Sequence, residues 1–461
     1  MLRRNVTLVF GAALFIASSG VRSAFADDLK RRGMIGVQLA PVNDEVKARL
    51  NLPDNKGIFI SMVMPNTAAA AGGLAANDVI VKIGDDDISA LRDLQRILRK
   101  YGAGDTIRFT VLREGQPVTK DLTLLPRPLE TSPDYDVVYE SAGEPGKRIR
   151  VILTKPKTDD AAKSQKLPAV LFVPGPMAQT VEFAAQGQNP FRDIVAGLTN
   201  AGFATIRVDR PGIGDSEGLD VHENTVATDA AAYQAALARV GSFPGVDADN
   251  VFVFAHSGGT AIVSQFLPSV KVKGVATYAA FVRPWAEHSM EASARLWKLE
   301  LFKDDEIKTR SANEKLFMDE CYRQKRTPKE ILTSHPELKT YMDTFLQDET
   351  MIFGVHYKYM QELANMDLQA AWSKVNTSVL AVWGEGDFNA SKADSELIAS
   401  LVNKSNPGKA KFLVLPRCDH GFHDVEDQEE SFLAEGGGKF NPAIIETLTA
   451  WMREIAGKKS S

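Results

Sequence analysis

The stretch that most constrains the fold is N-V-F-V-F-A-H-S-G-G-T, from Asn250 to Thr260. Its apolar residues 251–254 are typical of a buried strand, and the small residues after them allow a sharp turn into a helix. The pattern places Ser257 at that turn, where a strained backbone lifts the hydroxyl clear of the sheet and only small side chains fit two positions away. Ala255 and Gly259 are both small. Such a loose pattern also arises by chance, so it needs partners elsewhere in the chain.

Short apolar strands and amphipathic helices alternate around this stretch. Strands are expected at 169–173, 204–208, 251–254, 275–278, 379–383 and 412–415, and helices at 191–201, 226–240, 260–267 and 442–455. Two strands that pair antiparallel, 137–139 and 149–154, come before them. The alternation favours an α/β fold with a mainly parallel sheet and helices on both faces.

Helical sequence rich in aromatic residues and methionine interrupts the alternation between about 281 and 374. Such a segment forms either a small subdomain with its own core or a cap whose underside lines a pocket beside Ser257. We expect a helical cap.

The partners that a nucleophilic serine needs occur in the second half of the chain. The hydroxyl becomes reactive when an imidazole takes its proton and a carboxylate orients that imidazole. Asp387 lies in the loop G-E-G-D after strand 379–383, and His420 lies in the loop D-H-G-F after strand 412–415. Catalytic groups of open α/β sheets gather beyond the carboxyl ends of the strands. We therefore predict a catalytic triad of Ser257, Asp387 and His420.

Other residues compete for two of these roles. His423 lies in the same loop as the assigned base, and His256 adjoins the serine, where it is expected to shape the turn. Glu385 and Asp419 compete with Asp387 for the role of the acid. Asp419 directly precedes the assigned histidine and would have difficulty facing its ring, so we keep the first assignments.

Residues from about 135 to 457 resemble the α/β-hydrolase superfamily, in its esterase and acyl-peptidase branch. The resemblance rests on the elbow A-H-S-G-G, the segment D-R-P-G-I-G-D-S from Asp209 to Ser216, the acid loop and the histidine loop, in the chain order Ser, Asp, His. It implies an α/β-hydrolase domain at 137–457 with a helical cap at about 281–374. It also implies an acyl-serine intermediate, with no metal and no organic cofactor.

The oxyanion hole departs from the pattern of this superfamily. One donor is expected to be the N–H of Gly258, and the second should come from the loop after strand 169–173. Relatives usually carry His-Gly-x there, whereas this chain has Pro174-Gly175-Pro176-Met177. Pro176 has no N–H to donate, so we assign the second donor to Met177. Without a second donor the rate would fall by about two to three orders of magnitude.

An N-terminal unit at about 30–125 has its own pattern. It reads G-M-I-G-V from Gly33, V-M-P-N-T-A-A-A-A-G-G-L from Val63, N-D-V-I from Asn77, and a tight turn with an amphipathic helix after Gly84. This unit resembles a PDZ domain of the kind attached to bacterial periplasmic serine proteases, which implies a small α+β domain.

The PDZ resemblance implies a binding site for a peptide or protein C-terminus. Backbone N–H groups of Gly33, Met34, Ile35 and Gly36 would capture the carboxylate while the peptide adds to the sheet as a strand. Two neighbouring arginines, Arg31 and Arg32, would add positive charge. The alternative is a domain that only docks against the rest of the chain. A proline-spaced polar linker, 126–136, follows the unit.

The first 26 residues have the three-part layout of a secretory signal, with an A-F-A cleavage site before Asp27. Their apolar run, Val6 to about Ala17, is shorter than the roughly 20 residues of a membrane span. We therefore predict a signal peptide at 1–26, a periplasmic or secreted protein, and no transmembrane segment after cleavage. Removing three arginines changes the formal charge from −5 to −8, which argues against nucleic acid as a partner.

Two cysteines occur in the whole chain, Cys321 and Cys418. An oxidising compartment would permit a disulfide between them, and two separate buried thiols are equally consistent with their spacing. The sequence leaves both alternatives open.

Three functions follow from these patterns. The leading hypothesis is an exported serine hydrolase that cleaves carboxylic esters of a small-molecule or peptidyl acyl substrate. The second is a serine peptidase, of aminopeptidase or acyl-peptidase type, that acts on peptides held by the PDZ-like unit. The third, motivated by Pro176, is a PDZ-type peptide-binding protein with a weak or inactive hydrolase domain.

Overall fold

The computed structural model describes residues 29–157, 166–176, 179–184, 189–346 and 350–457. The described chain divides into two compact units, one within Ala26–Leu129 and the other within Glu130–Ser461. The division falls inside the segment expected to be a linker.

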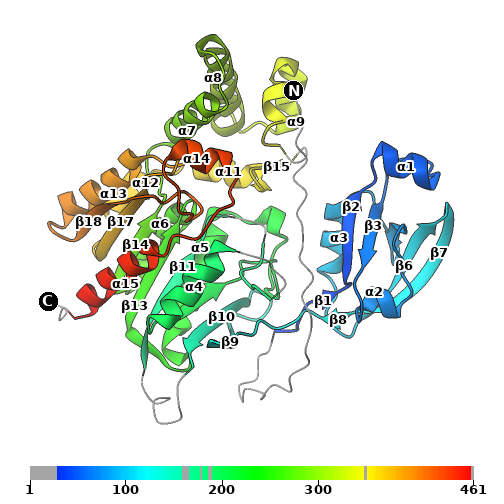
Figure 1. The fold of residues 1–461 in the computed structure, drawn as a ribbon, viewed down its shortest axis with the longest axis horizontal. Helices are drawn as coiled ribbons and strands as arrows, with labels where there is room; N and C mark the ends of the chain where they lie inside the picture. The colour runs from blue at the N-terminus through cyan, green and yellow to red at the C-terminus, as the bar shows by residue number, and fades with distance from the viewer. Residues whose placement is uncertain (1–28, 158–165, 177–178, 185–188, 347–349, 458–461) are drawn as a thin grey trace. The chain divides into compact units, whose positions relative to one another are not determined.

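The smaller unit is built on an antiparallel sheet in the order β2-β3-β4-β6-β7, with the short β5 paired to β4 (Figure 1). Its strands are β2 (Val37–Pro41), β3 (Ile58–Val63), β4 (Val79–Ile83), β5 (Asp86–Asp87), β6 (Thr106–Arg113) and β7 (Gln116–Thr123). Its helices are α1 (Asp44–Leu50), α2 (Ala68–Ala71) and α3 (Leu91–Leu98). Because β2 lies at the edge of this sheet, it has one side open to another strand.

A short ribbon joins the two ends of this unit. Strand β1 (Gly33–Met34) pairs antiparallel with β8 (Leu125–Pro126). The guanidinium of Arg31 donates to the carbonyl oxygens of Arg127 at 3.0 Å and Pro128 at 2.6 Å. The segment expected to bind peptides is therefore hydrogen-bonded to the segment that leaves the unit.

The larger unit contains an eight-stranded sheet in the order β18-β17-β14-β13-β11-β12-β10-β9. The strands are β9 (Tyr135–Ala142), β10 (Ile149–Pro156), β11 (Leu167–Val173), β12 (Ala204–Val208), β13 (Val246–His256), β14 (Gly274–Tyr278), β17 (Ser378–Gly384) and β18 (Ala410–Leu415). The strands from β12 to β18 in this order are parallel, and β10 pairs antiparallel with both β9 and β12. The carboxyl ends of β13, β17 and β18 thus lie at one edge of the sheet.

Helices cover both faces of this sheet (Figure 1). They are α4 (Pro190–Asn200) and α15 (Ala443–Ala456) on one face, and α5 (Val226–Arg239), α6 (Gly259–Phe266) and α13 (Lys392–Ser405) on the other. Alternate residues of a strand point to opposite faces. Phe252 and Phe254 accordingly join the core with α4 and α15, while Val251 and Val253 join the other core. Burial on both faces explains why the central strands are continuous apolar runs.

A mainly helical insertion lies between β14 and β17. It contains α7 (Trp285–Leu299), α8 (Asp304–Met318), α9 (Pro328–Ser334), α10 (Lys339–Met342), the hairpin β15 (Met351–Ile352) with β16 (Val355–His356), α11 (Tyr357–Ala364) and α12 (Leu368–Ser373). Its first residues are held by Asp394 of α13, whose carboxylate accepts the N–H groups of Val282 at 3.0 Å and Arg283 at 2.9 Å.

The two cysteines are free thiols, and both are buried. Of the two alternatives left open by the sequence, the structure therefore contains separate thiols rather than a disulfide. Burial raises the pKa of Cys321 and of Cys418 to about 12, so both remain protonated at neutral pH. Within the described ranges, no helix is long and apolar enough to cross a membrane.

Candidate active site

Ser257 lies in a sharp turn between β13 and α6. Its φ of 52° is in the left-handed region, which costs energy for a residue with a Cβ. The Ser257 N–H donates to the carbonyl oxygen of Tyr278 at 2.9 Å, which holds the turn against β14. A Cβ at Gly259 would lie 2.0 Å from the carbonyl oxygen of Val173. The turn therefore requires glycine at 259, as expected for a nucleophile elbow.

The structure brings Ser257, His420 and Asp387 together. The Nδ1 atom of His420 lies 2.9 Å from Oδ2 of Asp387. The Nε2 atom of the same ring lies 3.2 Å from Oγ of Ser257. Because a carboxylate only accepts hydrogen bonds, Nδ1 carries the proton and Nε2 presents its lone pair to the serine hydroxyl.

The Asp387 carboxylate is fully buried and has a partner on each oxygen. Its Oδ1 accepts the N–H groups of Asn389 at 2.8 Å and Ala390 at 2.9 Å. These two bonds fix the carboxyl plane, so that Oδ2 remains for the imidazole. The loop after β17 thus fixes the orientation of this carboxylate toward the His420 ring.

Burial and charge act in opposite directions on His420. Burial disfavours the charged ring, but the Asp387 carboxylate outweighs it and raises the pKa of His420 above its ordinary value of 6.5. The same carboxylate stabilises the imidazolium that forms when the ring takes a proton.

His256, beside the serine, contacts the loop that carries His420. Its Nε2 lies 2.9 Å from the carbonyl oxygen of His420 and donates to it. The His256 ring packs against Phe422, with ring centroids 4.8 Å apart. Burial, assisted by the neighbouring His420, lowers the pKa of His256 to about 3. The ring is therefore a neutral donor at physiological pH.

The other competing residues have different partners. His423 is buried, and its Nδ1 lies 3.1 Å from Oδ2 of Asp419. Asp419 also accepts the N–H of Gly421 at 2.9 Å and that of His423 at 2.7 Å. These hydrogen bonds between Asp419 and residues 421 and 423 stabilise the loop that carries His420. Glu385, the remaining competitor, is exposed. The pairing of His423 with Asp419 had no direct signal in the sequence.

The two expected oxyanion donors are the N–H groups of Gly258 and Met177, and only the first belongs to a described residue. The Gly258 N–H has no acceptor among the described residues. A Cβ at Gly175 would lie 3.5 Å from this nitrogen and 3.8 Å from Cβ of Ser257, and a Cβ at Gly258 would lie 2.5 Å from Cδ of Pro176. The loop after β11 therefore passes directly over the elbow. Met177 lies outside the described residues, so its role stays a prediction.

The expected peptide-binding segment of the smaller unit, residues 33–36, is only partly available to a peptide. Gly33 and Met34 pair with β8. The N–H groups of Ile35 and Gly36 have no acceptor in the described part of the chain, while their carbonyl oxygens accept from Ala69 at 2.9 Å and from Met64 at 3.0 Å. Two free donors thus lie beside the edge strand β2.

Arg31 and Arg32 bond to backbone carbonyls of the smaller unit. The Arg31 guanidinium binds the carbonyls of Arg127 and Pro128, and the Arg32 guanidinium binds that of Arg99. These bonds hold both side chains in place. Among the described residues, no group of three or more His, Cys, Asp or Glu side chains is arranged to hold a metal ion.

Comparison with known families gives a match for each unit. Residues 33–124 match the PDZ domain family. Residues 170–435 match the alpha/beta hydrolase family.

Several curated relatives of the PDZ region are periplasmic proteases. The chain is 33% identical over 94 residues to the periplasmic serine endoprotease DegP of Salmonella typhimurium, which covers 20% of each protein. It is 30% identical over 112 residues to a probable periplasmic serine protease do/HhoA-like of Haemophilus influenzae, which covers 24% of each. The match thus spans about a quarter or less of the length of these relatives.

Solved structures with similar folds share little sequence with this chain. A hypothetical protein, PA2218, of Pseudomonas aeruginosa is 14% identical, with 71% of this chain and 95% of that chain covered and a TM-score of 0.46. Est1E of Butyrivibrio proteoclasticus is 15% identical, with 70% and 99% covered and a TM-score of 0.42. The acylaminoacyl peptidase of Pyrococcus horikoshii is 9% identical, with 77% and 55% covered and a TM-score of 0.44.

The hydrolase match covers more than half of the chain and includes Ser257, Asp387 and His420. The protein is a hydrolase of the alpha/beta hydrolase family, with a PDZ domain on the N-terminal side of its α/β-hydrolase fold.

Proposed function

We propose that this protein is a serine hydrolase that cleaves carboxylic esters through an acyl-serine intermediate. The observation that carries the proposal is the connected path from Asp387 through His420 to Ser257, with heavy-atom distances of 2.9 Å and 3.2 Å. Both distances are within the range in which a base takes a proton from a serine hydroxyl.

In the proposed reaction, Oγ of Ser257 attacks the ester carbonyl carbon while Nε2 of His420 takes the hydroxyl proton. Asp387 stabilises the resulting imidazolium, and the N–H of Gly258 donates to the oxyanion. The imidazolium then protonates the alkoxide as the C–O bond breaks, which leaves the acyl group on Ser257. A water molecule then attacks the acyl carbon while His420 takes its proton. The imidazolium returns the proton to Oγ of Ser257 as the acid leaves.

A peptide amide as substrate is the second candidate, and the PDZ unit supports it. The free N–H groups of Ile35 and Gly36 lie beside the open edge of β2, and this combination suits a peptide that ends in a carboxylate. Under this alternative, the same triad cleaves a peptide that the PDZ domain has bound.

Matched substrates separate these two candidates. An ester and an amide with the same acyl group and leaving groups of equal size are compared by kcat/KM on the full chain, with Ser257→Ala as control. We expect turnover of the ester, and none by the control. Turnover of aminoacyl or acylaminoacyl amides at rates equal to those of the esters would favour the peptidase instead.

Peptide binding is measured separately, because it does not depend on the triad. Fluorescent peptides that end in a free carboxylate are compared with the same peptides as C-terminal amides, by anisotropy on the full-length Ser257→Ala variant. Tighter binding of the free acid would support carboxylate capture, whereas equal or no binding would count against it.

We also propose that the protein is exported. The signal-like pattern of residues 1–26, which lie outside the described residues, and the periplasmic relatives of the PDZ region support this. N-terminal sequencing of the protein from a periplasmic extract should begin at Asp27. Recovery of the uncleaved chain from the cytoplasmic fraction alone would contradict export.

A further inference from the structure

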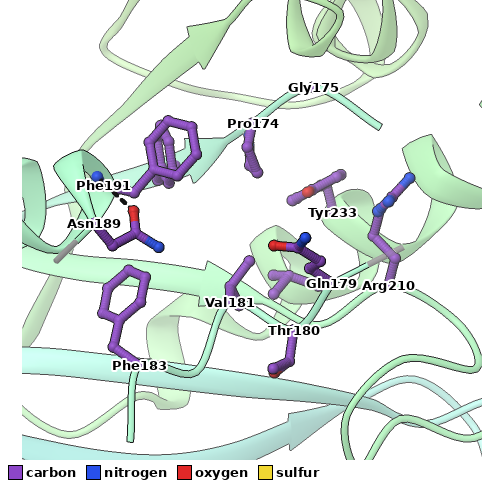
Figure 2. A pocket seen from close by; sticks show the side chains of 12 residues that line it. Pro174, Gly175, Gln179, Thr180, Val181, Phe183, Asn189, Phe191, Arg210 and Tyr233 are labelled. Atoms are coloured by element: carbon purple, nitrogen blue, oxygen red, sulfur yellow. Dashed lines mark hydrogen bonds between the residues drawn. The ribbon is translucent and has the colours of Figure 1, made fainter. Parts of the chain in front are cut away.

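A pocket of about 140 Å³ lies where β11 and β12 end. Figure 2 shows the aromatic side chains of Phe183 and Phe191 on one side of it, with Tyr233 and Arg210 on the other. Gly175, in the loop that follows β11, also lines the pocket. No step of the proposed mechanism uses this space.

The pocket begins beside the nucleophile. A Cβ at Gly175 would lie only 3.8 Å from Cβ of Ser257 and 3.5 Å from the Gly258 nitrogen. A substrate carbonyl that reaches both the Ser257 hydroxyl and the Gly258 N–H must therefore lie next to the mouth formed by Gly175.

The strand order indicates which part of a substrate the pocket faces. Asp387 and His420 follow β17 and β18, which lie on one side of β13. The pocket lies at the ends of β11 and β12, on the other side of β13. The leaving group must be near Nε2 of His420 to receive its proton. The acyl group therefore extends toward the pocket.

Size and lining restrict the acyl group. A cavity of about 150 Å³ lined by apolar side chains holds one benzene molecule, so 140 Å³ suits a single ring or a short chain. The rings of Phe172 and Phe191, both in the lining, have centroids 5.2 Å apart at 49°. Such walls favour an aromatic or compact apolar group.

One buried polar group in the lining of the pocket is the hydroxyl of Tyr233. It is buried and has no acceptor among the described residues. The nearby Tyr359 hydroxyl, by contrast, donates to Oδ2 of Asp229 at 3.1 Å. Because a buried donor without an acceptor is unfavourable, the Tyr233 hydroxyl indicates that a ligand oxygen belongs on this side of the pocket.

The charges around Tyr233 disfavour an anionic ligand. Arg210 is the cation, and its Nη1 is already 2.5 Å from Oδ2 of Asp229. A second carboxylate, Asp209, accepts from the Thr180 hydroxyl, which lines the pocket, at 2.8 Å. The charged groups that act on the Tyr233 hydroxyl are thus one guanidinium and two carboxylates, so the ligand oxygen that meets this hydroxyl should be uncharged.

We propose that this pocket binds the acyl part of the substrate, a compact uncharged group of about one ring that presents an oxygen acceptor to Tyr233. The inference rests on the proposed function, because it names the substrate class of that site.

A pair of matched esters tests the role of Tyr233. The 4-nitrophenyl esters of 4-hydroxyphenylacetic and 4-methylphenylacetic acid have nearly the same shape, and only the first carries an oxygen at the para position of the acyl ring. In Tyr233→Phe, the ratio of kcat/KM for the hydroxyl ester to that for the methyl ester should fall by about twofold to tenfold. Tyr359→Phe is the matched control and should leave this ratio unchanged. An unchanged ratio in Tyr233→Phe would overturn the proposal.

Filling the pocket tests its position. The half-buried side chain of Val181 lines the pocket, and its backbone N–H donates to Asp209 at 2.8 Å whichever side chain is present. In Val181→Phe the ratio of kcat/KM for the ring esters to that for 4-nitrophenyl acetate should fall at least about tenfold, because the added ring occupies the space. Equal effects on ring and acetyl esters would overturn the proposal.

Binding without chemistry separates this inference from the proposed function. The amides of the same two acids are titrated calorimetrically into Ser257→Ala and into Ser257→Ala with Tyr233→Phe. A preference for the hydroxyl that Tyr233→Phe removes supports the pocket, even if no ester is hydrolysed and the proposed function fails. Suppose instead that ester hydrolysis depends on Ser257, but that Tyr233→Phe leaves the ratio of kcat/KM for the two esters unchanged. The proposed function is then supported, and the proposed role of the pocket is overturned. If neither hydrolysis nor binding is observed, both the proposed function and the proposed role of the pocket are overturned.

Discussion

The Nε2 atom of His256 lies 2.9 Å from the carbonyl oxygen of His420. The residue before Ser257 therefore supports the backbone of the residue expected to activate this serine. Because the pKa of His256 is lowered to about 3 by burial and by the neighbouring His420, this bond persists at every pH at which the reaction is expected to run.

Removing this donor should slow catalysis without weakening substrate binding. In His256→Phe the His420 carbonyl loses its partner, and a buried unpaired acceptor costs about 1–3 kcal/mol. We expect kcat to fall by about tenfold with KM little changed. His256→Gln keeps a side-chain N–H and should recover part of the rate. A rise in KM alone, or no recovery in the glutamine variant, would contradict a positioning role.

The rate should decrease in acid, with a midpoint above pH 6.5. Asp387 outweighs burial and raises the pKa of His420, so the imidazole stays protonated, and unable to act as a base, to a higher pH than a free histidine. A profile of kcat/KM should therefore fall as the pH drops through that raised value. NMR titration of the ring in Asp387→Asn should show a lower pKa than in the wild type. An equal or higher pKa would show that Asp387 is not the cause.

The segment after the PDZ domain should contribute strongly to stability. The Glu130 carboxylate bonds the Arg207 guanidinium at 2.9 Å and 3.0 Å and accepts the N–H of Phe183 at 2.9 Å. Both side chains are nearly inaccessible to solvent. Glu130→Ala leaves a buried unpaired charge and should lower the free energy of unfolding by about 3–5 kcal/mol.

An exposed ion pair gives the matched control for Glu130. Glu454 lies 2.9 Å from Nζ of Lys411 at the surface. Glu454→Ala should change the free energy of unfolding by no more than about 1 kcal/mol. Equal effects of the two variants in urea unfolding would show that the buried pair with Arg207 has no special role.

A buried glutamate in the insertion should make stability depend on pH. Glu314 is 1% exposed, and its Oε1 accepts the hydroxyls of Ser289 at 2.9 Å and Ser293 at 3.0 Å, while Oε2 has no partner in the described part of the chain. Burial outweighs these bonds and raises the pKa of Glu314 above 4.5. The folded state thus keeps a proton that the unfolded state loses as the pH rises, so stability falls from about pH 4.5 upward.

Glu314→Gln removes this titration. The variant should therefore become progressively more stable than the wild type between pH 4 and pH 7, by about 1.4 kcal/mol for each unit by which the pKa is raised. Unfolding in urea at several pH values measures the difference. Glu287→Gln, at an exposed position of α7, is the control for the loss of one carboxylate from the insertion. A constant difference for Glu314→Gln would contradict a raised pKa.

The central strands could be predicted from sequence because burial on both faces makes them continuous apolar runs. The strand expected at 204–208 has those bounds in the structure, and the strand expected at 251–254 forms the apolar centre of β13. Helix α13 was not predicted, although Ser391 before it accepts the N–H of Ala393 as an N-cap. A capping residue followed by an amphipathic run was the signal that could have found it.

Tertiary partners could not be read from the sequence. The segment 126–136 has the composition of a solvated linker, yet Glu130 within it is buried against Arg207, 77 residues away. The pairing of Asp419 with His423 and the separate burial of Cys321 and Cys418 likewise depend on tertiary packing. Local patterns specify strands and turns, but the partner of a charge or a thiol is decided by the assembled core.

We propose that Ser257 is a nucleophile activated by His420, whose Nε2 lies 3.2 Å from the serine Oγ. The most direct measurement is the intact mass of the full chain after incubation with a fluorophosphonate, followed by peptide mapping. We expect a single phosphonyl adduct on Ser257, formed slowly in His420→Ala and absent in Ser257→Ala. No adduct on folded wild-type protein, or an adduct that persists in Ser257→Ala, would show that Ser257 is not such a nucleophile.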